Sequence, residues 1–397
     1  MFSSLRVEGF RCLTDITLRF EAGQPLVLIG ENGSGKSAIL EALVFLEKLF
    51  SVQPLETLWM DHGGADAVFA RAQGAARRMR FTLQTATTQA YVYTFSLLLL
   101  PGGGVYVDAE TLHHDGHLLL ERSGQDGAVF NASTGVRDAF KARPLELVLL
   151  KLNQPTLYPW REELVSRLQS ASQIHPRFAV SPAWALVGGT QGQGGSLMRP
   201  LSSTYPQYET RLSRNGINLV NVLHTLYAEQ PPRWELIQDD FRAEFARCKG
   251  QRFGPVPGEG GRIRLQWYDQ QVGDWTGLEA MSDGMVSYLM MLAAVHGLPD
   301  DALLAIDEPE LHLHPRLLLR VTERLCEAAS RARVLITTHS DALLDALPEA
   351  HMQAVRMVRL DPTGTTLHRL DTEALGTWRA QYGLGTLRAM GRLRPAG

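Results

Sequence analysis

A glycine-rich segment near the start of the sequence constrains the fold more than any other feature. Residues 30–37 read Gly-Glu-Asn-Gly-Ser-Gly-Lys-Ser, which fits the pattern G-x-x-x-x-G-K-S/T. A short apolar run at residues 25–29 precedes the segment, and apolar residues spaced by three and four positions follow it from Ile39 to Phe50. This order predicts a buried strand, a phosphate-binding loop and an amphipathic helix.

The residue types of this loop suit phosphate groups. Glycines allow backbone N–H groups to close around phosphate oxygens, and the N-terminus of the following helix adds the positive end of its dipole. Lys36 would reach the phosphates as a point charge, and the Ser37 hydroxyl would bind Mg²⁺. The other residues expected to contact the phosphates are Asn32, Gly33, Ser34 and Gly35.

A strand–helix–strand pattern lies near the other end of the sequence. Residues 302–306 and 334–338 are apolar runs, and residues 316–329 between them have helical periodicity. Strand, helix and strand at this spacing indicate a parallel sheet. The two ends of the chain therefore predict one α/β domain that is divided by a long middle segment.

Two acids follow the first of these strands. Asp307 would bind the Mg²⁺ of a nucleotide and Glu308 would act on an attacking water, whereas two solvated acids at a strand end are the alternative. A phosphate-binding loop on the same predicted sheet favours the site. His339 follows the next strand, where it would donate to a γ-phosphate or orient the water; a lone histidine there is more often capped or solvated.

A further motif, Met-Ser-Asp-Gly-Met at residues 281–285, precedes an apolar helical segment at residues 286–295. Ser282 as the N-cap residue, with Gly284 beside it, would make a second helix terminus that grips phosphate. An ordinary N-cap is the alternative. The position of the motif, about one helix and one strand before Asp307, favours the phosphate role.

The middle segment combines several kinds of structure. Residues 78–130 are expected to form antiparallel strands, with a hairpin that turns at Asp115-Gly116. The glycine-rich residues 188–195 predict a loop, and scattered prolines without a heptad pattern exclude a long coiled coil. Helical segments are expected at residues 144–172 and 217–247.

The composition narrows the class of protein. A net charge of −3 gives no indication of nucleic-acid binding, and the apolar runs are too short to span a membrane. The three cysteines, Cys12, Cys248 and Cys326, have no metal-ligand spacing, and the N-terminus lacks the pattern of a signal peptide. These features predict a cytoplasmic protein without a membrane partner.

The order of these motifs resembles that of ABC-type ATPases, because RecA-like and AAA+ motors have no signature motif before their Asp-Glu strand. Several details resemble the RecF, SMC and OLD-like branch, whose opening strand carries an arginine, here Arg11 within residues 5–15, that helps to hold the nucleotide. Residues 307–315 and 338–340 resemble later motifs of the same branch. Two further segments, residues 215–219 and 382–391, are similar to compact bacterial members without a coiled coil, which are often labelled predicted AAA-family ATPases.

The resemblance implies an α/β fold, namely an ABC-type ATPase head with a mixed or parallel core sheet, an antiparallel β lobe and a helical insertion. Residues 1–50 and 281–397 would form the ATPase core. Residues 51–143 would form the antiparallel β lobe of the head, and residues 144–280 a mostly helical insertion that leads to the signature lobe.

The resemblance also implies a homodimer in which two protomers enclose two ATP molecules. ATP binding would close the dimer, and hydrolysis assisted by Glu308 would let it reopen. The residues implied to act in cis are the catalytic Lys36, Glu308 and His339 and the Mg²⁺ ligands Ser37 and Asp307, and those in trans are Ser282 and Gly284.

Three departures from the family pattern bear on these roles. The signature reads Met-Ser-Asp-Gly-Met, which limits the carry-over to Ser282 and Gly284. Ser287 occupies a position where related chains often have a basic residue. Gln154 is the candidate for the glutamine of the Q-loop.

Three functions are compatible with such an ATPase. The first is a regulatory ATPase of a phage-defence-like system that controls a separate protein effector, a nuclease or a toxin. A nuclease would be a separate partner because no further cluster of acids follows His339. The second is a RecF-like ATPase that binds DNA during repair or maintenance. The third, the nucleotide-binding subunit of a transporter, fits less well because of the long middle segment and the RecF-like opening.

Other polar clusters have simpler explanations. The histidines at positions 113, 114 and 117 suggest a metal site or, more simply, exposed hairpin residues. Four basic residues suggest contact with nucleic acid or a solvated strand edge, and they are Arg71, Arg77, Arg78 and Arg80. Past Glu308, two histidines are expected to shape the dimer interface rather than bind zinc, namely His312 and His314.

Overall fold

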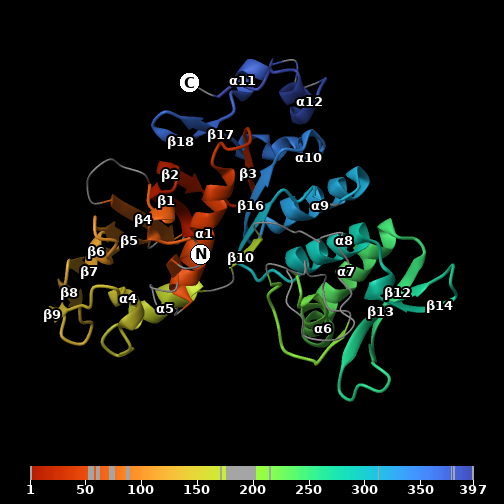
Figure 1. The fold of residues 1–397 in the computed structure, drawn as a ribbon, viewed down its shortest axis with the longest axis horizontal. Coiled ribbons are helices and arrows are strands. Elements are labelled where there is room, and N and C mark those ends of the chain that lie inside the picture. The colour runs from red at the N-terminus through yellow and green to blue at the C-terminus, as the bar shows by residue number, and fades with distance from the viewer. Residues whose placement is uncertain are drawn as a thin grey trace.

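The computed structural model describes residues 2–51, 58–59, 63–70, 77–85, 90–169, 172–175, 203–213, 216–311, 313–376, 378 and 381–395. In this part of the chain the strands form three sheets (Figure 1). A largely parallel sheet lies at the centre, an antiparallel sheet lies on one side of it, and a lobe of helices and short strands lies on the other. This arrangement confirms the predicted α/β fold class.

The antiparallel sheet has eight strands among the described residues. In spatial order they are β2 (Leu13–Arg19), β1 (Phe2–Phe10), β4 (Arg77–Thr85), β5 (Tyr91–Leu99), β6 (Val105–His114), β7 (His117–Ser123), β8 (Asp126–Phe130) and β9 (Arg137–Lys141). The predicted hairpin turn is confirmed, because Asp115 and Gly116 join β6 to β7 with φ angles of 49° and 81°, as a two-residue hairpin turn of this type requires. Strand β1 belongs to this sheet because it pairs with β4.

The central sheet has six strands in the described part of the chain. In spatial order they are β10 (Ser172–His175), β15 (Leu303–Asp307), β16 (Arg333–Thr338), β3 (Leu26–Ile29), β17 (Val355–Asp361) and β18 (Gly364–Arg369). All neighbours are parallel except β17 and β18. Apolar side chains on both faces of β3 and β15 are buried, as expected for a sheet covered on both sides. The carboxyl ends of β3, β15 and β16 therefore meet at one edge, where ligands bind in open α/β sheets.

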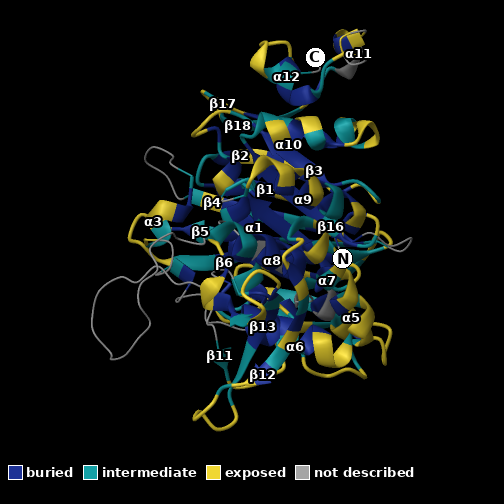
Figure 2. Ribbon diagram, turned by 90° about the vertical axis from the view of Figure 1, so that its right-hand side faces the viewer, coloured by how far each residue is buried: buried dark blue, intermediate teal, exposed yellow. Residues whose placement is uncertain are grey.

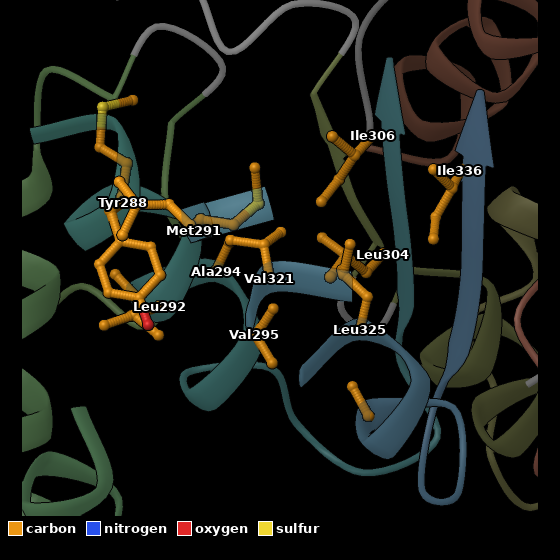
Figure 3. Close-up of a cluster of buried hydrophobic side chains, with 14 of the residues drawn as sticks. Tyr288, Met291, Leu292, Ala294, Val295, Leu304, Ile306, Val321, Leu325 and Ile336 are labelled. Carbon is orange, nitrogen blue, oxygen red and sulfur yellow. The ribbon is translucent and has the colours of Figure 1, made fainter. Parts of the chain in front are cut away.

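Helices cover both faces of the central sheet. Helix α1 (Lys36–Phe50) packs between one face and the antiparallel sheet in a shared core. Helix α9 (Pro315–Ala328) packs on the other face, and α8 (Asp283–His296) and α10 (Asp341–Ala346) pack against α9 in the same core. Figure 3 shows this second core, in which Val321 and Leu325 of α9 lie between the side chains of β15 and those of α8. Buried residues concentrate along β3, β16 and α8 (Figure 2).

The middle of the chain supplies further helices and a third sheet. Helices α4 (Val148–Lys151) and α5 (Pro159–Gln169) lie beside the antiparallel lobe, and α6 (Leu219–Glu229) and α7 (Pro231–Glu244) pack near α8 (Figure 1). The third sheet was not anticipated from the sequence; its strands are β11 (Ser203–Thr204), β13 (Ile263–Asp269), β12 (Cys248–Pro255) and β14 (Asp274–Gly277). The remaining short elements are α3 (Ala65–Val68), η1 (Leu278–Ala280), η2 (Glu349–Ala354), α11 (Thr372–Leu375) and α12 (Leu384–Ala389).

The predicted loop at residues 188–195 lies outside the described residues. Within the described ranges, none of the helices has both the length and the apolar character needed to cross a bilayer.

Candidate active site

The phosphate loop connects β3 to α1, as the sequence predicts. Gly33 and Gly35 have φ angles of 79° and 107°, a region that glycine adopts without steric cost. A Cβ atom at Gly35 would overlap the side chain of Thr365, whose buried hydroxyl donates to the Ser34 carbonyl over 3.0 Å. Strand β18 therefore braces the loop from behind, and this contact requires glycine at position 35.

The Lys36 side chain folds back over the loop. Its Nζ donates to the carbonyl oxygens of Gly30 at 2.8 Å and Glu31 at 3.0 Å. The residue is largely buried, and the Ser34 hydroxyl beside it is buried without a hydrogen-bond partner in the described part of the chain. The loop thus contains a cation and an unpaired hydroxyl of the kind that a phosphate group would satisfy.

Four charged groups surround Lys36. Burial lowers the pKa of the Lys36 ammonium, and the negative fields of Glu308, Asp307 and Glu310 raise it in opposition. The Arg388 guanidinium also lies close enough to lower this pKa. The structure therefore brings Lys36 from one end of the chain next to the Asp-Glu strand from the other end.

Asp307 ends β15 and is largely buried. The Thr337 hydroxyl on the neighbouring strand donates to Asp307 Oδ1, which fixes the direction of the carboxylate. The next residue, Glu308, has a φ of 48° although it is not glycine and precedes Pro309. Left-handed backbone at such a residue costs about 1–3 kcal/mol and concentrates at functional sites.

His339 follows β16 and faces Glu308. Its Nε2 lies 3.3 Å from Glu308 Oε1, and both side chains are 32% exposed. The two residues can therefore share a proton or a water while remaining accessible to a ligand. The sequence places them at neighbouring strand ends, and the structure brings them into contact.

Glu310 has a role that the sequence did not suggest. Its Oε1 accepts hydrogen bonds from the Thr338 hydroxyl at 2.7 Å, His339 N at 2.9 Å and Ser340 N at 3.1 Å. Glu310 thereby fixes the backbone that carries His339. The one feature of the sequence that could have indicated this role is the position of Glu310 in the Asp-Glu-Pro-Glu motif, and that motif alone does not specify what its second glutamate does.

Arg388 also reaches this loop, from helix α12. Its guanidinium donates to the carbonyl oxygen of His339, and its Nε lies 2.7 Å from Asp341 Oδ1. Asp345 of α10 holds α12 in place by accepting hydrogen bonds from Gly385 N at 2.7 Å and from Thr386. No local pattern around Arg388 predicts this contact, because it depends on how α12 packs on α10.

Arg11 lies at the turn between β1 and β2, beside helix α1. Its Nε is 2.7 Å from Glu41 Oε2, one turn beyond the phosphate loop. Burial raises the pKa of Glu41, Arg11 lowers it, and Asp307 raises it further. Arg11 therefore lies on the nucleotide side of α1, and its contact with a nucleotide stays a prediction.

Ser282 and Gly284 lie at the start of α8, in the lobe that also contains α6 and α7 (Figure 1). The exposed Ser282 is an N-cap whose Oγ accepts from Met285 N at 3.3 Å. Ser287 is buried, and its hydroxyl has no hydrogen-bond partner among the described residues. Ser287 thus points into the core, and it is not available to a phosphate.

A polar network anchors α8 to the neighbouring helices. Asp240 of α7 accepts from Arg324 of α9 at 2.6 Å and contacts His296 Nε2 of α8 at 2.9 Å. Burial raises the pKa of Asp240, and the contacts with His296 and Arg324 outweigh burial and hold this pKa below its usual value. The helix that starts with Ser282 is therefore tied to the helix that follows the Asp-Glu strand.

Two family models match separate parts of this chain. The model described as "AAA ATPase domain" matches residues 1–85, which include the phosphate loop. The model described as "AAA domain, putative AbiEii toxin, Type IV TA system" matches residues 196–345, which include Ser282, Asp307, Glu308 and His339. The chain is thus similar to AAA-type ATPase domains over both of the parts that form this site.

The chain is also similar to a curated relative. It is 27% identical over 217 residues to the DNA replication and repair protein RecF of Anaeromyxobacter sp. (strain K), a match that covers 47% of this chain and 57% of RecF. The chain thus spans little more than half the length of this curated relative.

Solved structures of SMC heads match over nearly their whole length. The SMC head bound to the C-winged helix domain of ScpA is 14% identical with a TM-score of 0.47, and the match covers 94% of this chain and 98% of that one. The SMC head domain from Thermotoga maritima is 11% identical with a TM-score of 0.44, with coverage of 94% and 99%.

The donor atoms in the site fit a nucleotide with Mg²⁺. Ser37 supplies a hydroxyl and Asp307 a carboxylate, which are the hard oxygen ligands that Mg²⁺ prefers. Ser37 is exposed at the start of α1, and Asp307 lies in the same charged cluster as Lys36. The fit supports Ser37 and Asp307 as the metal ligands, which stays a prediction.

The other polar clusters predicted from the sequence have structural partners. Strand β4 lies between β1 and β5, so the expectation that its arginines mark a strand edge is wrong. Its arginines are paired with acids: Arg77 with Asp66, Arg78 with Asp108 at 2.9 Å, and Arg80 with Glu8 at 3.9 Å. Arg71 and His312 lie outside the described residues.

The histidine candidates belong to a hairpin and a helix cap. His113, His114 and His117 flank the β6–β7 turn, and the ring of His114 stacks on Tyr91 at 4.2 Å. His314 caps α9 by accepting from Arg316 N. Within the described residues, no group of three His, Cys, Asp or Glu side chains could hold a metal ion.

Gln154 lies in an exposed turn between α4 and α5. Its carbonyl oxygen accepts from the backbone N–H groups of Leu157 and Tyr158. Its assignment as the Q-loop glutamine stays a prediction.

Proposed function

We propose that this chain is an ATPase that binds ATP with Mg²⁺ at the phosphate loop and hydrolyses it with Glu308 as general base. The contact between Glu308 and His339, 3.3 Å apart and beside Lys36, is the observation that supports this proposal most strongly. A carboxylate held by a histidine at the end of a parallel strand, next to a phosphate-binding cation, suits the activation of water for attack on phosphorus.

The reaction would proceed in one displacement. Glu308 accepts a proton from water as the water oxygen bonds to the γ-phosphorus, and the bond from that phosphorus to the bridging oxygen breaks. ADP and inorganic phosphate leave. Lys36 moves from the Gly30 and Glu31 carbonyls to the phosphates, and His339 orients the water or the carboxylate. Mg²⁺ bound by Ser37 and Asp307 would neutralise charge on the phosphate oxygens.

We also propose that ATP brings two copies of this chain together. Ser282 is exposed at an N-terminus of a long helix, in a different lobe from the phosphate loop. Such a terminus supplies backbone N–H groups to an anion. In the proposed dimer, Ser282 and Gly284 of one copy contact the nucleotide that is held by the loop of the other.

The dimer would act as a switch that controls a separate effector protein, a nuclease or a toxin. The description of the family model over residues 196–345, which names a type IV toxin–antitoxin system, supports this role. The similarity to RecF over 217 residues supports a second candidate equally, namely a DNA-binding ATPase in repair or maintenance.

The Glu308→Gln variant tests the mechanism and the dimer together. The amide keeps the shape of the side chain but accepts no proton, so turnover should fall by about 100-fold or more while ATP stays bound. Light scattering with ATP should then show a stable dimer. The matched control is Glu229→Gln on the exposed end of α6, which should hydrolyse ATP like the parent.

A Glu308→Gln protein that hydrolyses ATP at the parent rate would overturn the role of Glu308. One that remains monomeric with bound ATP would overturn the dimer.

The two biological roles are separated by other measurements. Duplex DNA binding that requires ATP and weakens steeply with salt supports the RecF-like role. Release or activation of a co-purifying nuclease or toxin upon ATP addition supports the effector role.

A further inference from the structure

A basic hollow lies where the two large sheets meet, apart from the phosphate loop. Its volume is about 290 Å³, and it is lined by Arg19 and Thr17 of β2, Leu26 of β3, Arg356 of β17 and Arg369 of β18. Strand β2 is the edge of the antiparallel sheet and β18 the edge of the central sheet. The hollow therefore opens along the seam between the sheets.

The hollow and the active site lie at opposite ends of the same strands. Leu26 begins β3, whereas the phosphate loop follows its last residue, Ile29. Arg369 ends β18, whereas Thr365 near the start of that strand braces the phosphate loop. A ligand in the hollow would therefore be distinct from the nucleotide.

The charges around the hollow are unbalanced. Three guanidinium groups face one carboxylate, because Glu21 Oε1 lies 3.5 Å from Arg356 and 3.6 Å from Arg369, and within the described residues no ion pair involves Arg19. The Arg356 side chain is only 11% exposed and donates to the Val355 carbonyl. Burial lowers the pKa of Arg356, Arg369 lowers it further, and Glu21 raises it. A net positive charge is thus held in a partly desolvated hollow.

We propose that this hollow binds a phosphate group. Guanidinium forks match the geometry of phosphate oxygens and bind them in pairs, and Thr17, which also lines the hollow, has a hydroxyl that can donate. A phosphate carries one or two negative charges, which offset the excess of the three arginines over Glu21. The phosphate is either free in solution or part of a nucleic-acid backbone, since both present the same oxygens. The inference does not rest on the proposed function, because no step of it uses ATP hydrolysis.

The variant Arg19→Gln/Arg369→Gln tests the hollow. Both arginines are exposed, so their loss should leave the fold and the ATPase rate unchanged, whereas Arg356 is kept because it binds backbone carbonyls. The matched control is Arg359→Gln, which removes a positive charge from the exposed part of β17 without touching the hollow.

The first measurement is calorimetric titration of inorganic phosphate into protein saturated with Mg²⁺ and ADP, at constant ionic strength. We expect one phosphate site in the hollow. The double variant should bind phosphate there at least tenfold more weakly, and the control should bind it as the parent does. Phosphate bound beside ADP in the active site would be unaffected by either variant, so it cannot mimic this result.

The second measurement is the anisotropy of a fluorescein-labelled duplex DNA over a range of salt concentrations. If the phosphate belongs to a nucleic-acid backbone, the double variant should bind the duplex at least tenfold more weakly. The slope of log affinity against log salt concentration should also fall by roughly one to two. If only free phosphate binding is lost, the ligand is a small anion. If phosphate and duplex each bind the double variant as tightly as the Arg359→Gln control, the inference is overturned.

Discussion

The Nε2 atom of His339 lies 3.3 Å from Oε1 of Glu308, which joins the ends of the neighbouring strands β15 and β16. The contact is not isolated, because Glu310 binds the backbone N–H of His339 and Arg388 binds its carbonyl oxygen. The position of the histidine ring is therefore set by residues from two other parts of the chain.

Replacing His339 by glutamine should slow hydrolysis without weakening ATP binding. The Glu308 carboxylate would lose its partner and misplace the water, an error that costs about 100-fold in rate. Single-turnover kinetics and nucleotide affinity should be measured together. A matched histidine substitution, His368→Gln on β18, should leave both unchanged. A loss of affinity equal to the loss of rate would contradict a role in orientation.

The left-handed backbone of Glu308 predicts an unusual order of stabilities. In ordinary backbone, alanine is more stable than glycine by roughly 0.5–1 kcal/mol. At a φ of 48° the order should reverse, so that Glu308→Gly is more stable than Glu308→Ala by about 1 kcal/mol. Both variants should fail to hydrolyse ATP. Urea denaturation checks the order, and a more stable alanine variant would show that the site holds no such strain.

Arg388→Gln should lower the turnover number with little change in KM. The substitution removes the hydrogen bond to the His339 carbonyl and the contact with Asp341, so the catalytic loop loses a support while the phosphate loop stays intact. Arg388→Lys should recover part of the rate, because it restores the charge. Arg392→Gln, on a residue that packs over Trp378 instead, is the control. An equal loss in the control would mean that the effect is one of general stability.

Gly35→Ala should destabilise the chain through one identified overlap. The new methyl group meets the Thr365 side chain, and the φ of 107° adds backbone strain of about 1–3 kcal/mol. Gly33→Ala has open space around its Cβ and should cost less. In a double-mutant cycle, Thr365→Ala should relieve part of the cost of Gly35→Ala, with a coupling energy of about 1 kcal/mol. Strict additivity would rule out the overlap.

Glu110 predicts a pH-dependent stability in the antiparallel lobe. This fully buried side chain accepts hydrogen bonds from Tyr93, Val148 N and Leu149 N at 2.8–2.9 Å. Glu110→Gln would turn an amide N–H toward a backbone N–H, which should cost about 1–3 kcal/mol.

The raised pKa of Glu110 determines how its contribution to stability changes with pH. Burial raises the pKa of Glu110 above its ordinary value of 4.5, against the opposing hydrogen bonds. The folded state therefore binds the proton more tightly, and the stability that Glu110 contributes falls as pH rises from 4.5 through the folded pKa. Urea unfolding at pH 5 and pH 8 should show a smaller gap between parent and Glu110→Gln at pH 8. A gap that widens with pH would contradict the assignment.

Local patterns were sufficient to predict much of the fold. The strand, loop and helix around Lys36, the buried strands before Asp307 and His339, and the turn at Asp115 each depend on residues within one short window. The pairing of β1 with β4 was not predictable in this way, since Leu5 pairs with Leu83 and nothing near Leu5 specifies that partner.

The site divides along the same line. Sequence motifs identify four residues of the site and place them at neighbouring strand ends, namely Lys36, Asp307, Glu308 and His339. The parts played by Glu310 and Arg388 arise only when β16, α10 and α12 pack together. A residue that acts by holding another backbone segment has no sequence pattern of its own.

The position of β3 between β16 and β17 has a consequence for synthesis on the ribosome. Val27 pairs with Ile336 on one side and Val355 on the other, so the strand that carries the phosphate loop is made early while both its neighbours are made late. Until β16 has emerged, β3 has no partner strand in the central sheet, and until β18 has emerged, Thr365 cannot brace Gly35. A nascent chain should therefore be unable to retain ATP, and nucleotide binding would report that translation has passed β18.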